Sequence, residues 1–404
     1  MAAYSSASAR PFRADPTMTN PKINPVILLS PVEDGYVAYD PVSDRLHHLN
    51  PVAALLAELS DGSRSVDKMC ELVGPLLPEG DTDAIDRWIR EGMEAGLLIG
   101  ADSPSADASE LSAADLFKLT KRLREAGKVQ TAYLCGKRTV ELEPANWDAW
   151  YDLGEVAQCV GRRDEARMAY QHYFDANPHD GEIEHLLIAL RDDKPPGRAS
   201  DRAIQHIYKN FAASYESRML DDLKYAGPQR MQEAVRATIG DARNLAILDL
   251  GCGSGLTGAT FKIHASSLTG VDLSQEMIDL ARARAVYDRL HLAEINDWLA
   301  EADDQFDLIV SCDCLIYFGD LTGVVSATRQ RLKPGGIFAL SLELGTREPF
   351  HLTDTGRYNH HPNHVRSAAA VANMKVEQLN QAFLRMEYGE EVKGLFAVLR
   401  APVQ

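Results

Sequence analysis

A glycine-rich stretch in the second half of the chain has the spacing of a ligand-binding turn. Residues 248–258 read LDLGCGSGLTG and begin inside an apolar run that is typical of a buried strand. A glycine-rich turn between a strand and a helix lets the backbone come close to a ligand, with the helix N-terminus behind it. The next apolar run, SLTGVD, ends on Asp272, 19 residues after Gly253, where an acidic side chain can hold a pair of ribose hydroxyls. Together these features predict a site for a nucleoside-containing ligand.

The third glycine of the turn separates two classes of ligand. The dinucleotide fingerprint is G-x-G-x-x-G, and Gly255 comes one position too early for it. With Asp249 in front, the motif DLGCGSG resembles the first motif of class I methyltransferases. That resemblance implies S-adenosylmethionine as the cofactor. It places Asp249 near the ammonium group of the cofactor and the glycine loop under its carboxylate and sulfonium.

Several other stretches of residues 201–404 carry the same resemblance. FAASYESRML, YDRLHLAEINDWL, SCDCLIYFGDL and TGRYNHHPNHV are similar to segments of bacterial methyltransferases that carry tetratricopeptide repeats. The resemblance implies a doubly wound, Rossmann-like α/β domain, with Glu294 near the adenine amine. Glu294 in place of Asp, and Cys312 and Cys314 in place of small apolar residues, depart from the family pattern. Cofactor contacts are expected from Asp249, Gly251, Cys252, Gly253, Gly255, Asp272, Leu273, Glu294, Ile295, Ser311 and Tyr215.

The candidates for catalysis are Tyr317, His360 and Asp313. Methyl transfer is an in-line displacement in which positioning does much of the work, and a base is needed only for a protonated nucleophile. Histidine is a common base because it titrates near neutral pH. Asp313 has a second interpretation as a helix cap. Three histidines within 360–364 resemble a metal cluster, but Pro362 breaks any helical face, and we expect no metal.

Two further groups of side chains have both a functional and a structural interpretation. Tyr208, Phe211 and Tyr215 precede the glycine loop and form either a lid over the cofactor or the packing face of an amphipathic helix. Glu343 ends the fifth strand pattern, where it is either part of the site or a solvated strand end.

Residues 26–100 read as a small winged-helix-like α+β domain. Strand-like runs with turn residues precede three helical patterns at roughly 51–60, 65–77 and 82–95. The run GYVAYDPVSDRLHHLN and the helices after it resemble the PqqD-like family, which implies recognition of a leader peptide. The peptide would add as a strand at the edge 44–49 and pack against a helix wall at 85–97. The alternative is a wing that only packs on its neighbours. Residues 1–25 are expected to be disordered.

Residues 112–192 contain a repeat with a period of 34. Gly127 and Gly161 are separated by 34 residues, as are Pro144 and Pro178, which is the tetratricopeptide signature. Two copies make a short all-α stack that serves either as a surface for a partner protein or peptide, or as a spacer. The composition of residues 193–200 predicts a linker between this stack and the domain 201–404.

The composition of the chain narrows the class of function. A net charge of −17 argues against nucleic-acid binding, and no apolar run reaches the ~18 residues that span a membrane. The six scattered cysteines predict reduced thiols in a cytoplasmic protein. Together, the resemblances to class I methyltransferases and to PqqD-like domains imply a methyltransferase that modifies a ribosomally made precursor peptide. The alternatives are a small-molecule, lipid or quinone methyltransferase whose front modules bind a partner protein, and a scaffold that binds cofactor without turnover.

Overall fold

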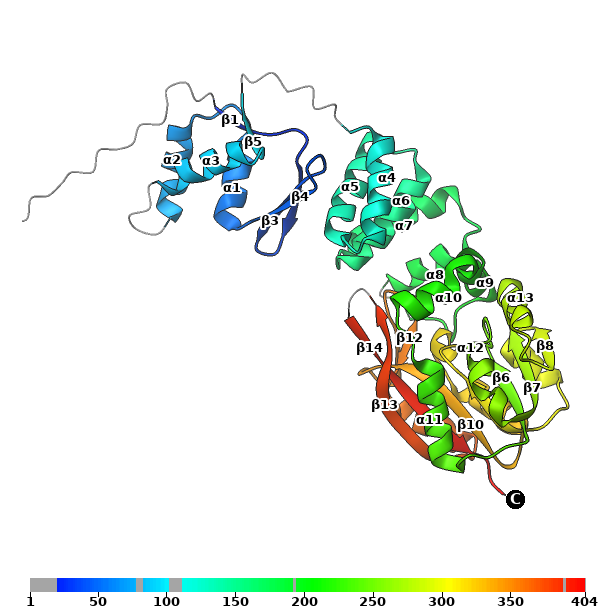
Figure 1. The fold of residues 1–404 in the computed structure, drawn as a ribbon. Coiled ribbons are helices and arrows are strands. Elements are labelled where there is room, and N and C mark those ends of the chain that lie inside the picture. Colours follow the sequence, from blue (N-terminus) through cyan, green and yellow to red (C-terminus); the bar gives the residue numbers. More distant parts are fainter. Residues whose placement is uncertain (1–19, 78–82, 102–110, 192–193, 388–389, 404) are drawn as a thin grey trace, which may run out of the picture. The chain divides into compact units, whose positions relative to one another are not determined.

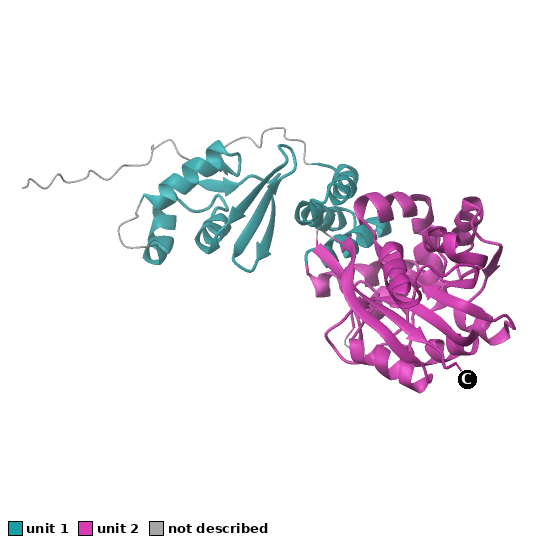
Figure 2. Cartoon of the chain, turned by 60° about the horizontal axis from the view of Figure 1, so that its bottom comes forward, with its two compact units in different colours: residues 1–160 teal, residues 161–404 magenta. Residues whose placement is uncertain are grey.

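The computed structural model describes residues 20–77, 83–101, 111–191, 194–387 and 390–403. These residues divide into two compact units, 1–160 and 161–404 (Figure 2). Most of the predicted N-terminal segment 1–25 lies outside the described residues. At its end, however, Pro21–Ile23 forms strand β1, which pairs antiparallel with β5 (Leu98–Gly100).

The first unit begins with a small α+β domain (Figure 1). Its three strands pair antiparallel in the order β2-β3-β4, so β4 lies at an edge of this sheet within the described residues. The side chain of Asn50 accepts a hydrogen bond from the Ala53 amide, and Pro51 occupies the first turn, which explains where the first helix begins. The elements are β2 (Leu28–Val32), β3 (Gly35–Asp40), β4 (Arg45–Leu49), α1 (Pro51–Leu59), α2 (Val66–Val73) and α3 (Ala84–Glu94).

Helices occupy the residues of the predicted 34-residue repeat. The first unit contains α4 (Ala113–Glu125), α5 (Val129–Leu142) and α6 (Trp147–Cys159). The second unit begins with α7 (Arg163–Ala176) and α8 (Gly181–Ala189). Gly127 and Gly161 have φ values of 73° and 77°, and this left-handed conformation favours glycine where a helix ends. The equal spacing of these glycines therefore reflects two equivalent turns.

The second unit is built on a mixed nine-stranded sheet. The order β10-β9-β6-β7-β8 is parallel, and β7 and β9 flank β6 on opposite sides, which makes β6 a topological switch point. The antiparallel hairpin β13–β14 joins β10 at the other side, so the sheet is not purely parallel. The strands are β6 (Leu245–Leu250), β7 (Ala265–Asp272), β8 (Arg289–Leu292), β9 (Phe306–Ser311), β10 (Leu332–Leu344), β11 (Phe350–Leu352), β12 (Tyr358–His360), β13 (Lys375–Glu387) and β14 (Glu390–Arg400).

Helices cover both faces of this sheet. Alternate residues of β6 belong to different cores, with Leu248 and Leu250 in one cluster and Ile247 in the other. Both clusters are rich in fully buried aliphatic side chains, so the parallel strands are apolar on both faces. The helices are α9 (Asp201–Phe211), α10 (Tyr215–Ser217), α11 (Gly227–Ile239), α12 (Leu256–Phe261), α13 (Gln275–Arg284), α14 (Ile295–Glu301), α15 (Thr322–Gln330) and α16 (Pro362–Val371).

The segment predicted to be a linker is packed into the second unit. The Ala199 side chain is fully buried, and its amide donates to the Tyr317 carbonyl at 2.8 Å. The Tyr358 hydroxyl donates to the Pro196 carbonyl at 2.7 Å. Composition alone missed these anchors because the partners lie more than 100 residues away. Among the described residues, none of the helices has both the length and the apolar character required to cross a membrane.

Candidate functional site

A pocket of about 600 Å³, including its open mouth, lies at the carboxyl ends of β6, β7, β8 and β9. Open α/β sheets bind ligands at this position, beside the switch point. The lining residues are Arg198, Ile204, Tyr208, Tyr215, Gly251, Gly253, Asp272, Leu273, Glu294, Ile295, Cys312, Asp313, Cys314, Tyr317 and Phe318.

The glycine loop gives the pocket its floor. Gly251, Gly253 and Gly255 all have φ between 52° and 88°, which is the left-handed region. A side-chain carbon on Gly251 would lie 2.1 Å from the Cys314 sulfur, so the loop can pack there only without a side chain. A carbon on Gly253 would instead have the Tyr215 hydroxyl as its nearest neighbour, at 3.8 Å. Gly253 therefore keeps space open in the pocket.

The loop amides are already used inside the protein. The amides of Gly251 and Cys252 donate to the Val271 carbonyl, and that of Gly253 donates to the Asp272 carboxylate at 2.8 Å. The glycines of this loop thus supply room more than hydrogen-bond donors. Gly255 does not line the pocket; it is the N-cap residue just before α12, and a side-chain carbon there would contact Tyr287 and Arg284.

Two buried carboxylates face the pocket from the ends of neighbouring strands. Asp272 is 9% exposed, and its second oxygen accepts from the Ser274 amide at 2.9 Å. Burial raises the pKa of Asp272, while the backbone donors Ser274, Gly253 and Leu273 oppose that effect. Glu294 is 8% exposed and caps α14 by accepting from the Asn296 and Asp297 amides. Both carboxylates keep acceptor capacity toward the pocket, because each oxygen can accept more than one hydrogen bond.

Three tyrosines form the aromatic side of the pocket. The hydroxyls of Tyr208 and Tyr317 lie 3.4 Å apart, and the ring of Tyr215 packs against Tyr208 with centroids 6.2 Å apart. Burial raises the pKa of each of these phenols, so they are neutral hydrogen-bonding groups. Phe211 does not line the pocket and packs edge-on against Tyr215, at 5.3 Å. Of the proposed lid residues, two tyrosines thus face the site and the phenylalanine supports them.

Asp313 enters the pocket from the end of β9 in a strained conformation. Its φ is 54°, which is uncommon for a residue other than glycine, and its amide donates to the Ser341 hydroxyl at 2.8 Å. Its carboxylate pairs with Arg385 at 3.1 Å. Burial raises the pKa of Asp313, while Arg385 works in the opposite direction. The proposed helix-capping role is wrong, because the carboxylate is held by an arginine from a distant strand.

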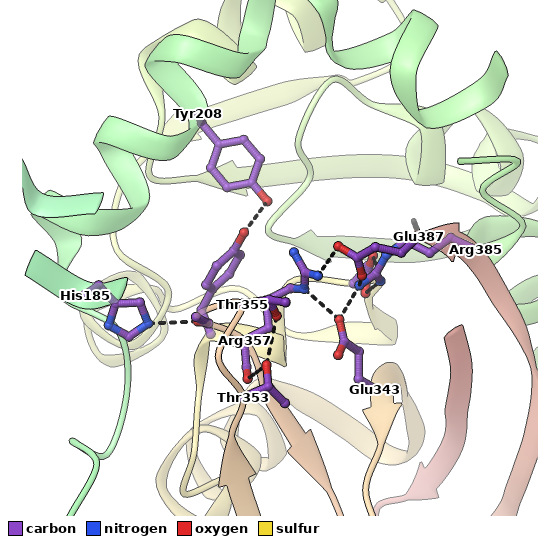
Figure 3. A network of polar contacts seen from close by, with 11 residues as sticks. His185, Tyr208, Glu343, Thr353, Thr355, Arg357, Arg385 and Glu387 are labelled. Carbon is purple, nitrogen blue, oxygen red and sulfur yellow. Dashed lines mark hydrogen bonds and ion pairs between the residues drawn. The ribbon is translucent and has the colours of Figure 1, made fainter. Parts of the chain in front are cut away.

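Arg385, the partner of Asp313, belongs to a buried network of charges (Figure 3). It also pairs with Glu343, and Arg357 lies between Glu343 and Glu387. Burial would raise the pKa of Glu343, but Arg357 and Arg385 hold it below its usual value. The interpretation of Glu343 as a solvated strand end is therefore wrong. The network fixes the Asp313 carboxylate from behind.

Three residues expected to touch the cofactor lie beneath the loop and do not line the pocket. The Asp249 carboxylate is fully buried and accepts from the Tyr287 hydroxyl at 2.7 Å. Cys252 is packed between the loop and α13, and the Ser311 hydroxyl donates to the Leu250 carbonyl at 3.0 Å. These side chains support the loop from below. The sequence motif could not separate this layer from the pocket, because neighbouring residues of a turn point in opposite directions.

His360 is a core residue and does not line the pocket. Its side chain is fully buried and stacks on His364 with ring centroids 5.6 Å apart. Burial lowers the pKa of His360 to about 3, which leaves it neutral at physiological pH. His364 contacts the Leu321 amide and the Gly319 carbonyl, so these two histidines pack inside the fold. The catalytic role expected for His360 is therefore contradicted.

Two arginines of the site were missed at the level of sequence. Arg198 lies in the presumed linker, and Arg385 lies on β13, more than 70 residues after Asp313. The signal for Arg198 was faint, a charged residue just before the helix cap Ser200. Arg385 sits in the alternating pattern of a long hairpin, and no local motif marks it.

Comparison with known proteins identifies the class of the domain. Residues 247–336 match the family described as "Methyltransferase domain", so this part of the chain is a methyltransferase domain. The methyltransferase domain is of the S-adenosylmethionine-dependent class, and S-adenosylmethionine is its cofactor.

The similarity to individual proteins is confined to part of the chain. A ubiquinone biosynthesis O-methyltransferase of Xanthomonas oryzae pv. oryzae is 28% identical over 120 residues, which cover 29% of this chain and 50% of that protein. The one from Bartonella tribocorum is 32% identical over 97 residues, covering 23% and 39%. The chain thus spans half or less of the length of these relatives. The solved 1,6-didemethyltoxoflavin-N1-methyltransferase of Burkholderia thailandensis is similar at 19% identity and a TM-score of 0.40, covering 52% of this chain and 93% of that one.

The pocket of the methyltransferase domain fits S-adenosylmethionine in its chemistry. Gly253 leaves open space where a side chain would stand, and the buried Asp272 carboxylate can accept from ribose hydroxyls. Glu294 can accept from an exocyclic amine, and Leu273 and Ile295 supply apolar walls beside them. Tyr208, Tyr215 and Tyr317 line the same pocket. The cofactor, when bound, supplies a methyl group on a positively charged sulfonium.

Proposed function

We propose that this chain transfers a methyl group from S-adenosylmethionine to a peptide that its N-terminal domain captures. The observation that supports it most is the pocket at the switch point of the methyltransferase domain, which holds Gly253, Asp272 and Glu294 in one cavity. The catalytic and recognition parts of this proposal rest on different evidence, and they are tested separately.

The chain's own residues have distinct roles in this reaction. Tyr208, Tyr215 and Tyr317 exclude water from the pocket and keep the reacting groups close, which is the main requirement of an in-line displacement. Asp313 lies in the same pocket and can accept a proton from a hydroxyl nucleophile, or from an ammonium group so that the neutral amine becomes the nucleophile. Arg385 orients that carboxylate and opposes the rise in its pKa. Tyr317 and Asp313 thus remain the candidates for the acceptor side.

The small domain of the first unit has an edge strand suited to peptide capture. β4 pairs with β3 on one side, and the register places His47 opposite Ala38 and His48 opposite Val37. An edge strand offers free N–H and C=O groups to an added strand. On the expected helix wall, Ile85 and Ile89 are buried in the domain's own core, so the wall would present its more exposed neighbours. The edge strand β4 and the resemblance to peptide-recognition domains together support peptide capture by this domain.

The relatives favour a second candidate. The two relatives described above are named for ubiquinone biosynthesis, which favours a small-molecule, lipid or quinone acceptor. In that case residues 26–100 and the repeat helices would bind a partner protein. The two candidates share the cofactor pocket and differ in what reaches Asp313.

The peptide proposal is tested with proline substitutions along β4. Proline lacks the N–H that a strand ladder requires. Successive amides of a strand point to opposite sides, so one of His47 and His48 directs its N–H away from β3. Proline at that residue, either His47→Pro or His48→Pro, should leave the circular dichroism spectrum and the cofactor affinity unchanged. The same variant should no longer bind a labelled candidate leader peptide in fluorescence anisotropy. Wild-type leader affinity in both folded variants would refute edge-strand capture. Transfer of a labelled methyl group to a quinol and to no peptide would favour the second candidate.

A further inference from the structure

An arginine from the segment before the Rossmann-like core lines the cofactor pocket. Arg198 stands beside Glu294, with 3.9 Å between its Nη2 and Oε1 of the carboxylate. Its guanidinium lies over the ring of Phe318, with 5.8 Å between Cζ and the ring centroid. Arg198 therefore stands between the residues that follow two different strands, β8 and β9.

The backbone of this segment is anchored independently of the arginine side chain. The amides of Gly319 and Asp320 donate to the Gly197 carbonyl at 2.8 and 3.2 Å, and the Ala199 amide donates to Tyr317. Arg198 itself forms an isolated bridge with Phe318 through its backbone. These bonds carry Arg198 to the rim of the pocket and hold it there.

The guanidinium is also held in a defined orientation. It donates to Asp201 at 2.6 Å and to the Ala199 carbonyl at 3.1 Å, yet its side chain keeps 31% exposure. A planar guanidinium stacks on aromatic rings and donates to ring nitrogens, and one fixed in advance loses little entropy on binding. The structure thus presents a preorganised planar cation next to a carboxylate.

We propose that Arg198 is a cofactor-binding residue that contacts the purine of S-adenosylmethionine. This inference rests on the proposed function, in which Glu294 accepts from the adenine amine. A carboxylate at the edge of the purine and a guanidinium at its face match an electron-rich heterocycle that carries an exocyclic amine. Removal of the guanidinium should weaken binding about tenfold, the scale of a partly desolvated cation–π contact.

The test uses the full chain and isothermal titration calorimetry with two probes. S-adenosylhomocysteine carries both the purine and the amino acid, and 5′-methylthioadenosine lacks the amino acid. Arg198→Ala should lose about the same factor for both probes, because both contain the purine. Arg202→Ala is the matched control, since Arg202 lies on α9, pairs with Glu184 and does not line the pocket. It should bind both probes like wild type.

The possible results separate the inference from its foundation. Wild-type affinity of Arg198→Ala for both probes, or a loss confined to S-adenosylhomocysteine, would overturn the contact with the purine. If Arg198→Ala melts well below wild type without ligand, Arg198→Gln decides, because its amide can still donate to Asp201. A stable Arg198→Gln with unchanged affinity would also overturn it. Failure of the wild-type chain to bind either probe would instead overturn the proposed function.

Discussion

The substitution Asp249→Asn tests the position of this carboxylate beneath the glycine loop. Burial raises the pKa of Asp249 from 3.8 to about 7, with the Tyr287 hydroxyl working in the opposite direction. Between pH 3.8 and about 7, Asp249 is therefore protonated in the folded state and ionised in the unfolded state. Stability from this group is complete at low pH and declines as the pH rises through about 7.

The size of the effect follows from the pH window. Each pH unit in which the folded state holds one extra proton costs about 1.4 kcal/mol as the pH rises. From pH 5 to 8 the wild-type second unit should therefore lose about 3 kcal/mol through Asp249, and Asn should lose none. For a unit of this size that corresponds to roughly 6–12 °C in melting temperature.

The assay compares melting temperatures of the two proteins without ligand between pH 5 and 8. Asn can still accept from Tyr287, so this hydrogen bond is kept, and other titrating groups contribute equally to both proteins. The melting temperature of wild type should fall toward that of the variant, or below it, as the pH rises. Parallel profiles would refute the interpretation, because Asp249 would then have an ordinary pKa and a hydrated carboxylate.

Other substitutions test the floor of the pocket and the histidine core. Gly253 has a φ of 52°, so Gly253→Ala should cost about 1 kcal/mol of stability. The added carbon points toward the pocket, so the variant should also bind the cofactor more weakly in calorimetry. In Gly251→Ala the added carbon meets the Cys314 sulfur, so this variant should lose more melting temperature than cofactor affinity. A loss mainly of affinity in Gly251→Ala and mainly of stability in Gly253→Ala would contradict the assigned faces of the loop. His360→Leu should keep cofactor binding and methyl transfer. The pKa of His360 is lowered to about 3, so in thermal melts wild type, but not the variant, should lose stability through this group as the pH falls below 6.5. If a folded His360→Leu variant no longer transferred a methyl group, the catalytic role of His360 would be restored.

Local patterns predicted the parts of the fold that local forces determine. The strand–loop–helix unit around Gly253 and the strand ending on Asp272 could be located because apolar runs and glycine spacing are local signals. The helix ends at Gly127 and Gly161 follow from the same reasoning, since glycine accepts the left-handed turn. The methyltransferase class rested on such a motif, and the comparison confirms it.

The parts that failed depend on long-range packing. His360 was expected to be a catalytic group, and its burial became evident only with the sheet and α16 in place. Asp313 was named as a candidate for catalysis, but its partner Arg385 comes from a hairpin far along the chain. Arg198 was assigned to a linker because the composition of residues 193–200 is typical of linkers. Burial and pairing across the fold are not encoded in short windows of sequence.

The most direct measurement of the central claim is a titration of S-adenosylhomocysteine into the full chain, with NAD as the competing nucleoside ligand. The account predicts saturable binding at one site per chain, a loss of about 1.5–3 kcal/mol of binding free energy in Asp272→Ala, and no heat with NAD. Asp272→Ala should weaken binding because it removes the carboxylate that faces the pocket and holds the Gly253 amide. Binding of NAD in place of S-adenosylhomocysteine, or unchanged affinity in Asp272→Ala, would contradict the account.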